Sequence, residues 1–340
     1  MKQHLNTLYV TTDNSRLSLD GESVVIALNG QNLGRIPLHN LQAIHTFGWS
    51  ISLSPQLMAH CAEMGVHISI CNPHGKLLCN VTGFTQGNVL LRRQQYRLAD
   101  SEKLSLSIAR EMIAAKILNC RNLLQRAVRD RPYLVQELEA VIKQLSQNVR
   151  SARKAMTYTE LLGIEGNAAE KYFSVFNLLI INEGFTFFGR VRRPPLDPVN
   201  ALLSFVYTLL SADCKSALES VGLDSAVGVY HKDRPGRPGL ALDLMEEFRA
   251  PLADRLVLSL MNRRQLKTDD FVVEFGGAVR LTDEARRCVL TAWQDRKKEQ
   301  ILHSFLQEKM SIGLLFQIQS RLLAQHVRGA LDSYPPVLWK

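Results

Sequence analysis

A histidine and two acidic residues in the second half of the sequence are of the types that bind divalent metal ions. His231 precedes a basic loop, 232–239, in which Pro-Gly occurs twice, and apolar residues at helical spacing over 240–249 predict a helix after it. On that helix Asp243 and Glu246 occupy neighbouring positions, three residues apart. Imidazole suits Mn²⁺ and other transition ions, and carboxylates suit Mg²⁺ and Mn²⁺. A surface helix with an acidic patch beside an ordinary loop histidine would have the same pattern, so this stretch alone leaves both interpretations open.

Glu165 places a charged side chain in the apolar row of another predicted helix. The apolar members of that row are Leu161, Ala168, Tyr172, Phe176 and Leu179. A carboxylate on the buried side of a helix is costly unless it is paired or binds a metal ion. Ala168 and Ala169 are small and leave room around it. The pattern favours Glu165 as a functional group, and a buried carboxylate paired with an arginine is the structural alternative.

Several stretches of the chain together resemble one protein family. They are residues 5–12, 87–93, 163–166, 193–203 and 229–249, and they occur in the family's order along nearly the whole chain. On these stretches the sequence resembles the CRISPR-associated integrase of spacer acquisition (the Cas-one family), in its type I-C-like form. No stretch is specific alone, because a G-x-E-G such as 163–166 is a weak signal.

The resemblance implies a catalytic metal site. In this family a Glu, a His and an acidic residue hold the metal, and they match Glu165, His231 and Glu246, with Mg²⁺ or Mn²⁺ as the ion. The third ligand is often Asp in relatives, so Glu246 lengthens it by one methylene. Asp243 matches a nearby acidic position with a supporting role.

The implied activity is that of a metal-dependent DNA integrase and endonuclease of CRISPR adaptation. The 3′-hydroxyl ends of new spacer DNA would be joined to the CRISPR repeat by transesterification, with the metal stabilising charge on the phosphate oxygens. One phosphodiester replaces another, so no nucleotide energy source is needed, and the sequence contains no G-x-x-x-x-G-K-[ST] loop. Two alternatives remain: a metal-dependent nuclease that hydrolyses branched or single-stranded DNA, and a non-catalytic DNA-binding scaffold.

Charge and composition agree with a DNA-binding protein. The net charge is +9 and the pI is near 9.3, which favours a polyanionic partner. Basic residues lie close to the proposed ligands, and we expect them to bind DNA, although solvated loop charge is the alternative. These residues are Arg192, Arg193, Lys232, Arg234 and Arg237.

Cysteine usage and hydropathy indicate the compartment. Six cysteines occur without a C-x-x-C pair, so a cysteine zinc site is improbable and reduced core thiols are expected. The N-terminus lacks the apolar region of a signal peptide, and no run approaches the roughly 18 apolar residues of a membrane span. We therefore expect a cytoplasmic protein with no membrane association.

The predicted fold class is α+β, with a small β-rich domain followed by a larger all-α catalytic domain. Residues 1–86 contain short alternating runs separated by the hairpin dipeptides Asp20-Gly21 and Asn29-Gly30. A connector follows at 87–100. The catalytic domain is expected at 101–340, with Asp197 capping a strongly apolar helix to about Ser220.

Further elements are predicted within this second domain. They are helices over 101–128, 132–153 and 157–181, a hairpin over 271–281, helices from 282 and over 303–329, and a loosely held end at 335–340.

The expected partners are DNA, a second copy of the chain and another protein. The β-rich domain carries no evident chemistry, and its expected role is dimerisation. The resemblance further implies a heterohexameric complex in which two homodimers flank a dimer of the small second CRISPR-associated protein (the Cas-two family).

Overall fold

The computed structural model describes residues 6–72, 77–81, 83, 89–191 and 193–339. By its contacts the chain divides into two compact units. The first contains Met1–Gly87 together with Val289–Asp295, and the second contains Asn88–Cys288 and Arg296–Lys340. The expected boundary after residue 86 lies one residue from this division.

Two four-stranded sheets form the first unit. In one sheet the order is β1-β5-β7-β8, with the first three strands parallel and β8 antiparallel to β7. In the other the order is β4-β3-β2-β6, and antiparallel hairpins connect β2, β3 and β4. The bounds are β1 Asn6–Val10, β2 Ser15–Asp20, β3 Ser23–Leu28, β4 Gln31–Pro37, β5 Leu41–Phe47, β6 Ser52–Leu53, β7 His67–Cys71 and β8 Leu77–Val81.

Turn residues and alternating apolar side chains explain this unit. Gly21, Asn29 and Gly30 all have positive φ at the two hairpin turns that their dipeptides predicted. The helix α1, Pro55–Met64, is capped by the Ser54 hydroxyl, which accepts from the Leu57 N–H at 3.2 Å. Side chains from both sheets and from α1 form one core, including Leu17, Ile44, Leu57 and Ile68.

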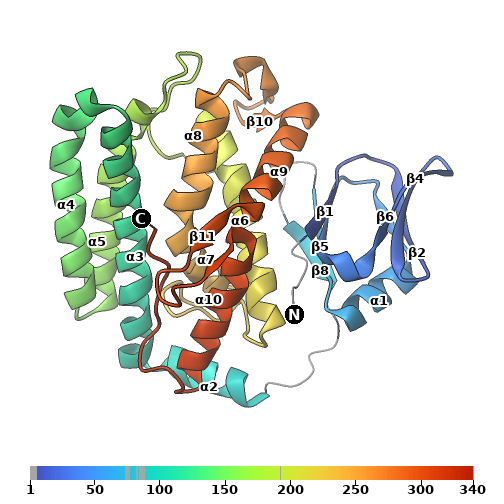
Figure 1. The fold of residues 1–340 in the computed structure, drawn as a ribbon, viewed down its shortest axis with the longest axis horizontal. Coiled ribbons are helices and arrows are strands. Elements are labelled where there is room, and N and C mark those ends of the chain that lie inside the picture. Colours follow the sequence, from blue (N-terminus) through green and yellow to red (C-terminus); the bar gives the residue numbers. More distant parts are fainter. Residues whose placement is uncertain (1–5, 73–76, 82, 84–88, 192, 340) are drawn as a thin grey trace. The chain divides into compact units, whose positions relative to one another are not determined.

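The second unit begins with four helices. Their bounds are α2 Val89–Asp100, α3 Glu102–Asp130, α4 Val135–Lys154 and α5 Tyr158–Ser174. Figure 1 shows α3, α4 and α5 side by side, and each contacts the other two. The predicted connector is therefore largely the helix α2, and the predicted helix over 157–181 ends early, with a 3-10 turn at Phe176–Leu179.

The next long helix is α6, Pro198–Ser220. The helices that follow it are α7 Gly239–Met245, α8 Arg255–Asn262, α9 Asp283–Lys298 and α10 Ile312–Val327. Helices α7, α8 and α10 all contact α6, which is buried along much of its length as its apolar sequence predicted. Between α7 and α8 the chain continues as a 3-10 turn, Glu246–Phe248, and a π-helical turn, Arg249–Asp254. The π-helical turn contains Pro251, which has no backbone N–H group to donate to the carbonyl four residues earlier, as a regular α-helix requires.

Two small hairpins interrupt the helical unit. One pairs β9, Phe271–Val273, with β10, Val279–Leu281, as predicted. The other pairs β11, Gln300–Leu302, with β12, Lys309–Ser311. The prediction of a helix over 303–329 is therefore wrong for its first part, and the helix α10 begins only at Ile312. The α+β fold class, β-rich first and mainly helical afterwards, is confirmed.

Helix α6 has the length and mean hydropathy of a membrane-spanning segment, which the prediction of no such run missed. It is 23 residues long, and 67% of its most apolar window is buried inside the protein. Core helices of water-soluble proteins meet the same criterion, so length and composition alone assign no membrane role to α6.

Candidate active site

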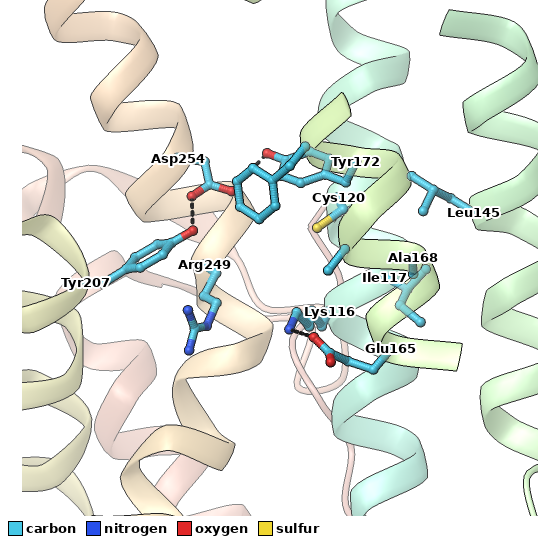
Figure 2. Close-up of a pocket in the computed structure, with 12 residues that line it drawn as sticks. Lys116, Ile117, Cys120, Leu145, Glu165, Ala168, Tyr172, Tyr207, Arg249 and Asp254 are labelled. Atoms are coloured by element: carbon cyan, nitrogen blue, oxygen red, sulfur yellow. Dashed lines mark hydrogen bonds and ion pairs between the residues drawn. The ribbon is translucent and has the colours of Figure 1, made fainter. Parts of the chain in front are cut away.

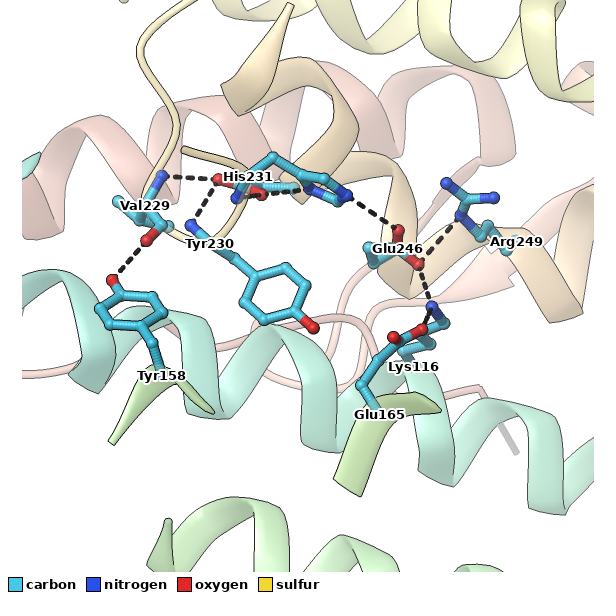
Figure 3. A network of polar contacts seen from close by, with 9 residues as sticks. Lys116, Tyr158, Glu165, Val229, Tyr230, His231, Glu246 and Arg249 are labelled. Carbon is cyan, nitrogen blue, oxygen red and sulfur yellow. Dashed lines mark hydrogen bonds and ion pairs between the residues drawn. The ribbon is translucent and has the colours of Figure 1, made fainter. Parts of the chain in front are cut away.

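The three predicted metal ligands come together in the second unit (Figure 3). Glu165 projects from α5, His231 lies in the loop before α7, and Glu246 begins the 3-10 turn after α7. The Nε2 atom of His231 is 3.9 Å from Oε1 of Glu246, and the Lys116 ammonium contacts carboxylate oxygens of both Glu165 and Glu246. Side chains separated by up to 130 positions, from Lys116 to Glu246, thus share one polar centre.

Asp243 holds the histidine loop in position. Its fully buried carboxylate accepts the backbone N–H groups of Val229, Tyr230 and His231 at 2.6, 3.0 and 2.8 Å. It also lies 2.7 Å from Nδ1 of His231. Because a carboxylate that accepts these bonds calls for a donor, the ring proton is assigned to Nδ1, which leaves Nε2 free to bind a metal. By this contact Asp243 orients the imidazole ring of His231, which is a physical basis for the supporting role predicted for Asp243.

The loop is also shaped by close backbone packing. A Cβ atom at Gly228 would lie 2.5 Å from the carbonyl oxygen of His231, and one at Gly239 would lie 2.7 Å from that of Ala226. The Tyr158 hydroxyl of α5 donates to the Val229 carbonyl oxygen. On α2, Gln95 donates to the carbonyl oxygens of Asp224 and Val227 at 2.8 and 3.0 Å. These contacts restrict where His231 can point.

Glu246 is buried between two cations. Its side chain is 3% exposed, and Oε2 is 2.8 Å from the Lys116 ammonium and 2.9 Å from Nε of Arg249. Burial alone would raise the pKa of Glu246, but Arg249 and Lys116 outweigh it and lower this pKa to about 2. The carboxylate is therefore ionised at neutral pH and available as a ligand.

Lys116 was missed in the sequence. It lies on α3 in a buried row with Met112 and Cys120, four positions away on either side. A lysine in an apolar helical row is the same kind of signal that identified Glu165. Burial works to lower the pKa of Lys116, but Glu246 and Glu165 raise it above its ordinary value, so its side chain is a cation here.

The donor set fits a divalent ion. Two carboxylates meet at a single cationic group, and the adjacent imidazole has its Nδ1 position occupied by a carboxylate, as in many histidine metal ligands. Within the described ranges, no three His, Cys, Asp or Glu side chains are already grouped to hold an ion, and Lys116 lies between the two glutamates. The residues suit a metal chemically, and the assignment of the three ligands stays a prediction.

Tyr230 directs a hydroxyl group toward the same centre. Figure 3 shows its ring between the histidine loop and the Lys116–Glu165 pair, and the residue is 7% exposed. Its hydroxyl is buried and has no hydrogen-bond partner among the described residues. Burial, and then the charges of Glu165, Glu246 and Asp243, raise the pKa of Tyr230, so the group keeps its proton and can act as a donor.

The predicted DNA-binding residues lie near the site to different extents. Arg192 lies outside the described residues, and Arg193 is exposed. Lys232, adjacent to His231, is exposed and its ammonium lies 4.0 Å from the centre of the Tyr158 ring. Arg234 is exposed and Arg237 half-buried in the same loop. Their contact with DNA stays a prediction.

A cavity adjoins Glu165 on the side of α5 (Figure 2). Lys116, Glu165, Ala168 and Arg249 are among the residues that line it. At its far end the buried carboxylate of Asp254 accepts the hydroxyl groups of Tyr172 at 2.8 Å and Tyr207 at 2.6 Å. Burial raises the pKa of Asp254 to about 6, although both hydroxyls and the charge of Arg249 oppose this rise.

The C-terminal segment contacts Glu247, the residue next to Glu246. Glu247, the next residue, is fully buried and accepts the Tyr334 hydroxyl and the Val337 N–H. Asn119 of α3 donates to the carbonyl oxygens of Glu247 and Val337 at 2.7 and 2.9 Å, and it accepts the Trp339 N–H. Figure 1 shows this end of the chain beside α3. The expectation that 335–340 is loosely held is therefore wrong for residues 335–339, because buried polar groups need these backbone partners.

Comparison with known proteins identifies the family. The family model described as CRISPR associated protein Cas1 matches residues 8–295. The chain belongs to the Cas1 family. A curated Cas1 from Chlorobaculum tepidum, named CRISPR-associated endonuclease Cas1 1, is 49% identical over 344 residues, which cover 100% of both chains. The family resemblance drawn from the motifs is confirmed, while its type I-C-like form stays a prediction.

Solved Cas1-like structures share the fold. A chain of a Cas6-RT-Cas1--Cas2 complex matches with a TM-score of 0.84 and 26% identity, over 100% of this chain and 36% of that chain. A casposase bound to integration product matches with a TM-score of 0.85 and 22% identity, over 99% of this chain and 95% of that chain. At that identity the casposase supports the fold alone.

Asp254→Asn should change how stability depends on pH. The folded-state pKa of about 6 lies above the ordinary value of 3.8, so the folded protein holds this proton more tightly than the unfolded chain. The wild type should lose about 3 kcal/mol of stability relative to D254N as the pH rises from about 3 to about 7. Denaturant unfolding at several pH values measures this difference, and a difference that stays constant over the range would contradict it.

Truncation after Asp332 should destabilise the second unit. Removing residues 333–340 leaves the buried side chains of Glu247 and Asn119 without several partners. Because each unpaired buried group costs about 1–3 kcal/mol, the unfolding free energy should fall by at least about 3 kcal/mol. Denaturant unfolding provides the measurement. A truncation after Trp339 is the control, and equal stabilities of the two shortened chains would show that the segment contributes nothing.

Proposed function

We propose that this protein joins the 3′-hydroxyl ends of new spacer DNA to CRISPR repeat DNA by metal-dependent transesterification. The observation that carries the proposal is the convergence of Glu165, His231 and Glu246 on one buried polar centre in a chain of the Cas1 family. These three side chains would hold one Mg²⁺ or Mn²⁺ ion, which when bound would stabilise negative charge on the phosphate and on the leaving oxygen.

Other residues would position the ligands and the substrate. Asp243 keeps the His231 ring oriented with Nε2 toward Glu246. The Tyr230 hydroxyl can donate a hydrogen bond to an oxygen of the reacting phosphate, since it is buried, protonated and unpaired within the described part of the chain. Such a donor has its effect where charge builds up during the reaction.

Basic loop residues would hold the DNA beside the cut. Lys232, Arg234 and Arg237 lie within six residues of His231, and Arg193 lies shortly before α6. We assign them phosphate contacts, together with Arg192, whose neighbour in the sequence is Arg193. The net charge of +9 favours the same partner.

The proposed assembly is a homodimer that binds a second small protein. The first unit carries the dimerisation role in this proposal. A Cas1-like chain of 26% identity belongs to a complex whose name includes Cas2, which supports a complex between this chain and a Cas-two protein. A heterohexamer of two Cas1 dimers around one Cas2 dimer is the arrangement we propose.

Glu165→Gln and His231→Ala should each abolish strand transfer. Each change removes one ligand, and we expect the rate to fall by about 10³-fold or more, together with weaker Mn²⁺ binding. The assay supplies spacer DNA with 3′-hydroxyl ends and labelled repeat DNA, and it detects joined products. Glu170→Gln, on the exposed side of the same helix, is the control and should retain activity.

The products of this assay also separate the alternatives. Joined DNA that depends on Glu165 supports integration, whereas shortened DNA without joining would indicate a hydrolytic nuclease. Activity that persists fully in E165Q would contradict a catalytic role for this centre and leave a DNA-binding scaffold.

Tyr230→Phe should slow strand transfer by about 10²-fold or more, the effect of losing one positioned donor. Thermal stability and Mn²⁺ affinity should not change, because the hydroxyl has no partner among the described residues and is not a proposed ligand. Tyr158→Phe offers the contrast, since its hydroxyl bonds to Val229 and its loss should lower the melting temperature. A Y230F protein with the wild-type transfer rate would remove Tyr230 from the mechanism.

A further inference from the structure

We infer that Lys116 is a built-in cation that holds Glu165 and Glu246 together before a divalent ion binds, and that it competes with that ion for their oxygens. This inference rests on the proposed function, because it takes the two glutamates to be metal ligands. The step it describes precedes the reaction: the divalent ion replaces the Lys116 ammonium between the two glutamates.

The contacts of Lys116 are those of a counter-ion. Its Nζ atom pairs with Oε1 of Glu165 and lies 2.8 Å from Oε2 of Glu246. The two carboxylates come from α5 and from the turn after α7, and they lie close to each other while little exposed to water. Like charges in such a place repel unless a cation separates them, so an ammonium between them stabilises the arrangement.

A divalent ion would be held by the same two carboxylates. Ligated by both glutamates, it would lie between them, where the Lys116 ammonium now pairs with both, and two cations in one place repel each other. Binding of the metal therefore includes the loss of the Lys116 contacts. The observed affinity of the site for the metal is therefore lower than its intrinsic affinity, by whatever those contacts contribute to the stability of the metal-free protein.

The structure provides space for the displaced ammonium. Lys116 lines the cavity shown in Figure 2, which is also lined by the small side chains of Ala168 and Ala169. Lysine carries its charge on a flexible four-carbon stem, so the ammonium can leave the glutamates without movement of α3. Arg249 differs, because its guanidinium also lies 4.7 Å from the centre of the Tyr207 ring and is held in a second contact. Lys116 is thus the cation suited to exchange.

Lys116→Met tests the exchange through metal binding by the intact chain without DNA. In calorimetric titration with Mn²⁺ the variant should bind about tenfold more tightly than the wild type, because no ammonium has to be displaced. Without metal its melting temperature should be lower than that of the wild type, and Mn²⁺ should raise it by a larger amount. A variant that was merely damaged would bind the metal more weakly, so the direction of the change is diagnostic.

Lys297→Met is the matched control. Lys297 is also a buried lysine, and its ammonium pairs with Asp213 at 3.2 Å. Its loss should lower stability but leave Mn²⁺ affinity unchanged. If K116M does not fold, Lys116→Gln removes the charge while keeping a polar side chain, and the same tighter binding is expected. Unchanged or weaker Mn²⁺ binding in the folded Lys116 variant would overturn the inference.

Failure of this inference can be told apart from failure of the proposed site. E165Q measured in the same titration reports on the site itself. Loss of binding in E165Q with unchanged affinity in K116M would reject the role of Lys116 alone. Wild-type Mn²⁺ binding in E165Q would reject the metal site, and with it the exchange.

Discussion

Compensation of buried charge is the constraint on which this centre depends. Glu246 is nearly inaccessible to water, and a carboxylate in such a place has to be neutralised, paired or coordinated. Here Lys116 and Arg249 pair with the same oxygen from two different elements, and the Lys116 ammonium extends the pairing to Glu165. The positions of α3, α5 and the turns after α7 are linked through these contacts, so the packing of the helices and the geometry of the glutamates depend on one another.

A second buried carboxylate arranges the histidine. Asp243 accepts three consecutive backbone N–H groups in addition to facing the imidazole ring, so one side chain determines both the path of the loop and the orientation of His231. The glycines at 228 and 239 allow the backbone segments to approach closely enough for these bonds. Glu247, which follows Glu246, likewise holds the C-terminal segment, because its carboxylate accepts the Tyr334 hydroxyl and the Val337 N–H. Three acidic residues within five positions thus have three different tasks, and their sequence spacing alone does not distinguish them.

Local signals predicted many element boundaries because each depends on a few neighbouring residues. Ser54 and Pro55 begin α1, Asp197 and Pro198 begin α6, and Asn29-Gly30 turns a hairpin, all as local chemistry requires. The region after α9 shows where this approach fails. Residues 300–311 form a hairpin because β11 and β12 pair with each other, and an apolar pattern cannot reveal such pairing. The prediction for the C-terminal residues was wrong for the same reason, because their partners, Asn119 and Glu247, lie far away in the sequence.

By itself the sequence determined most of the elements, the α+β class, the family and three candidate ligands, since these depend on local propensity and on motifs read along the chain. Only the tertiary structure placed Lys116 between the two glutamates, assigned Asp243 to the backbone of the histidine loop and directed the Tyr230 hydroxyl toward the centre. The physical reason is that a buried charge or hydroxyl acquires its role from the groups packed against it. Those groups are brought together by folding from helices and loops that the sequence keeps far apart.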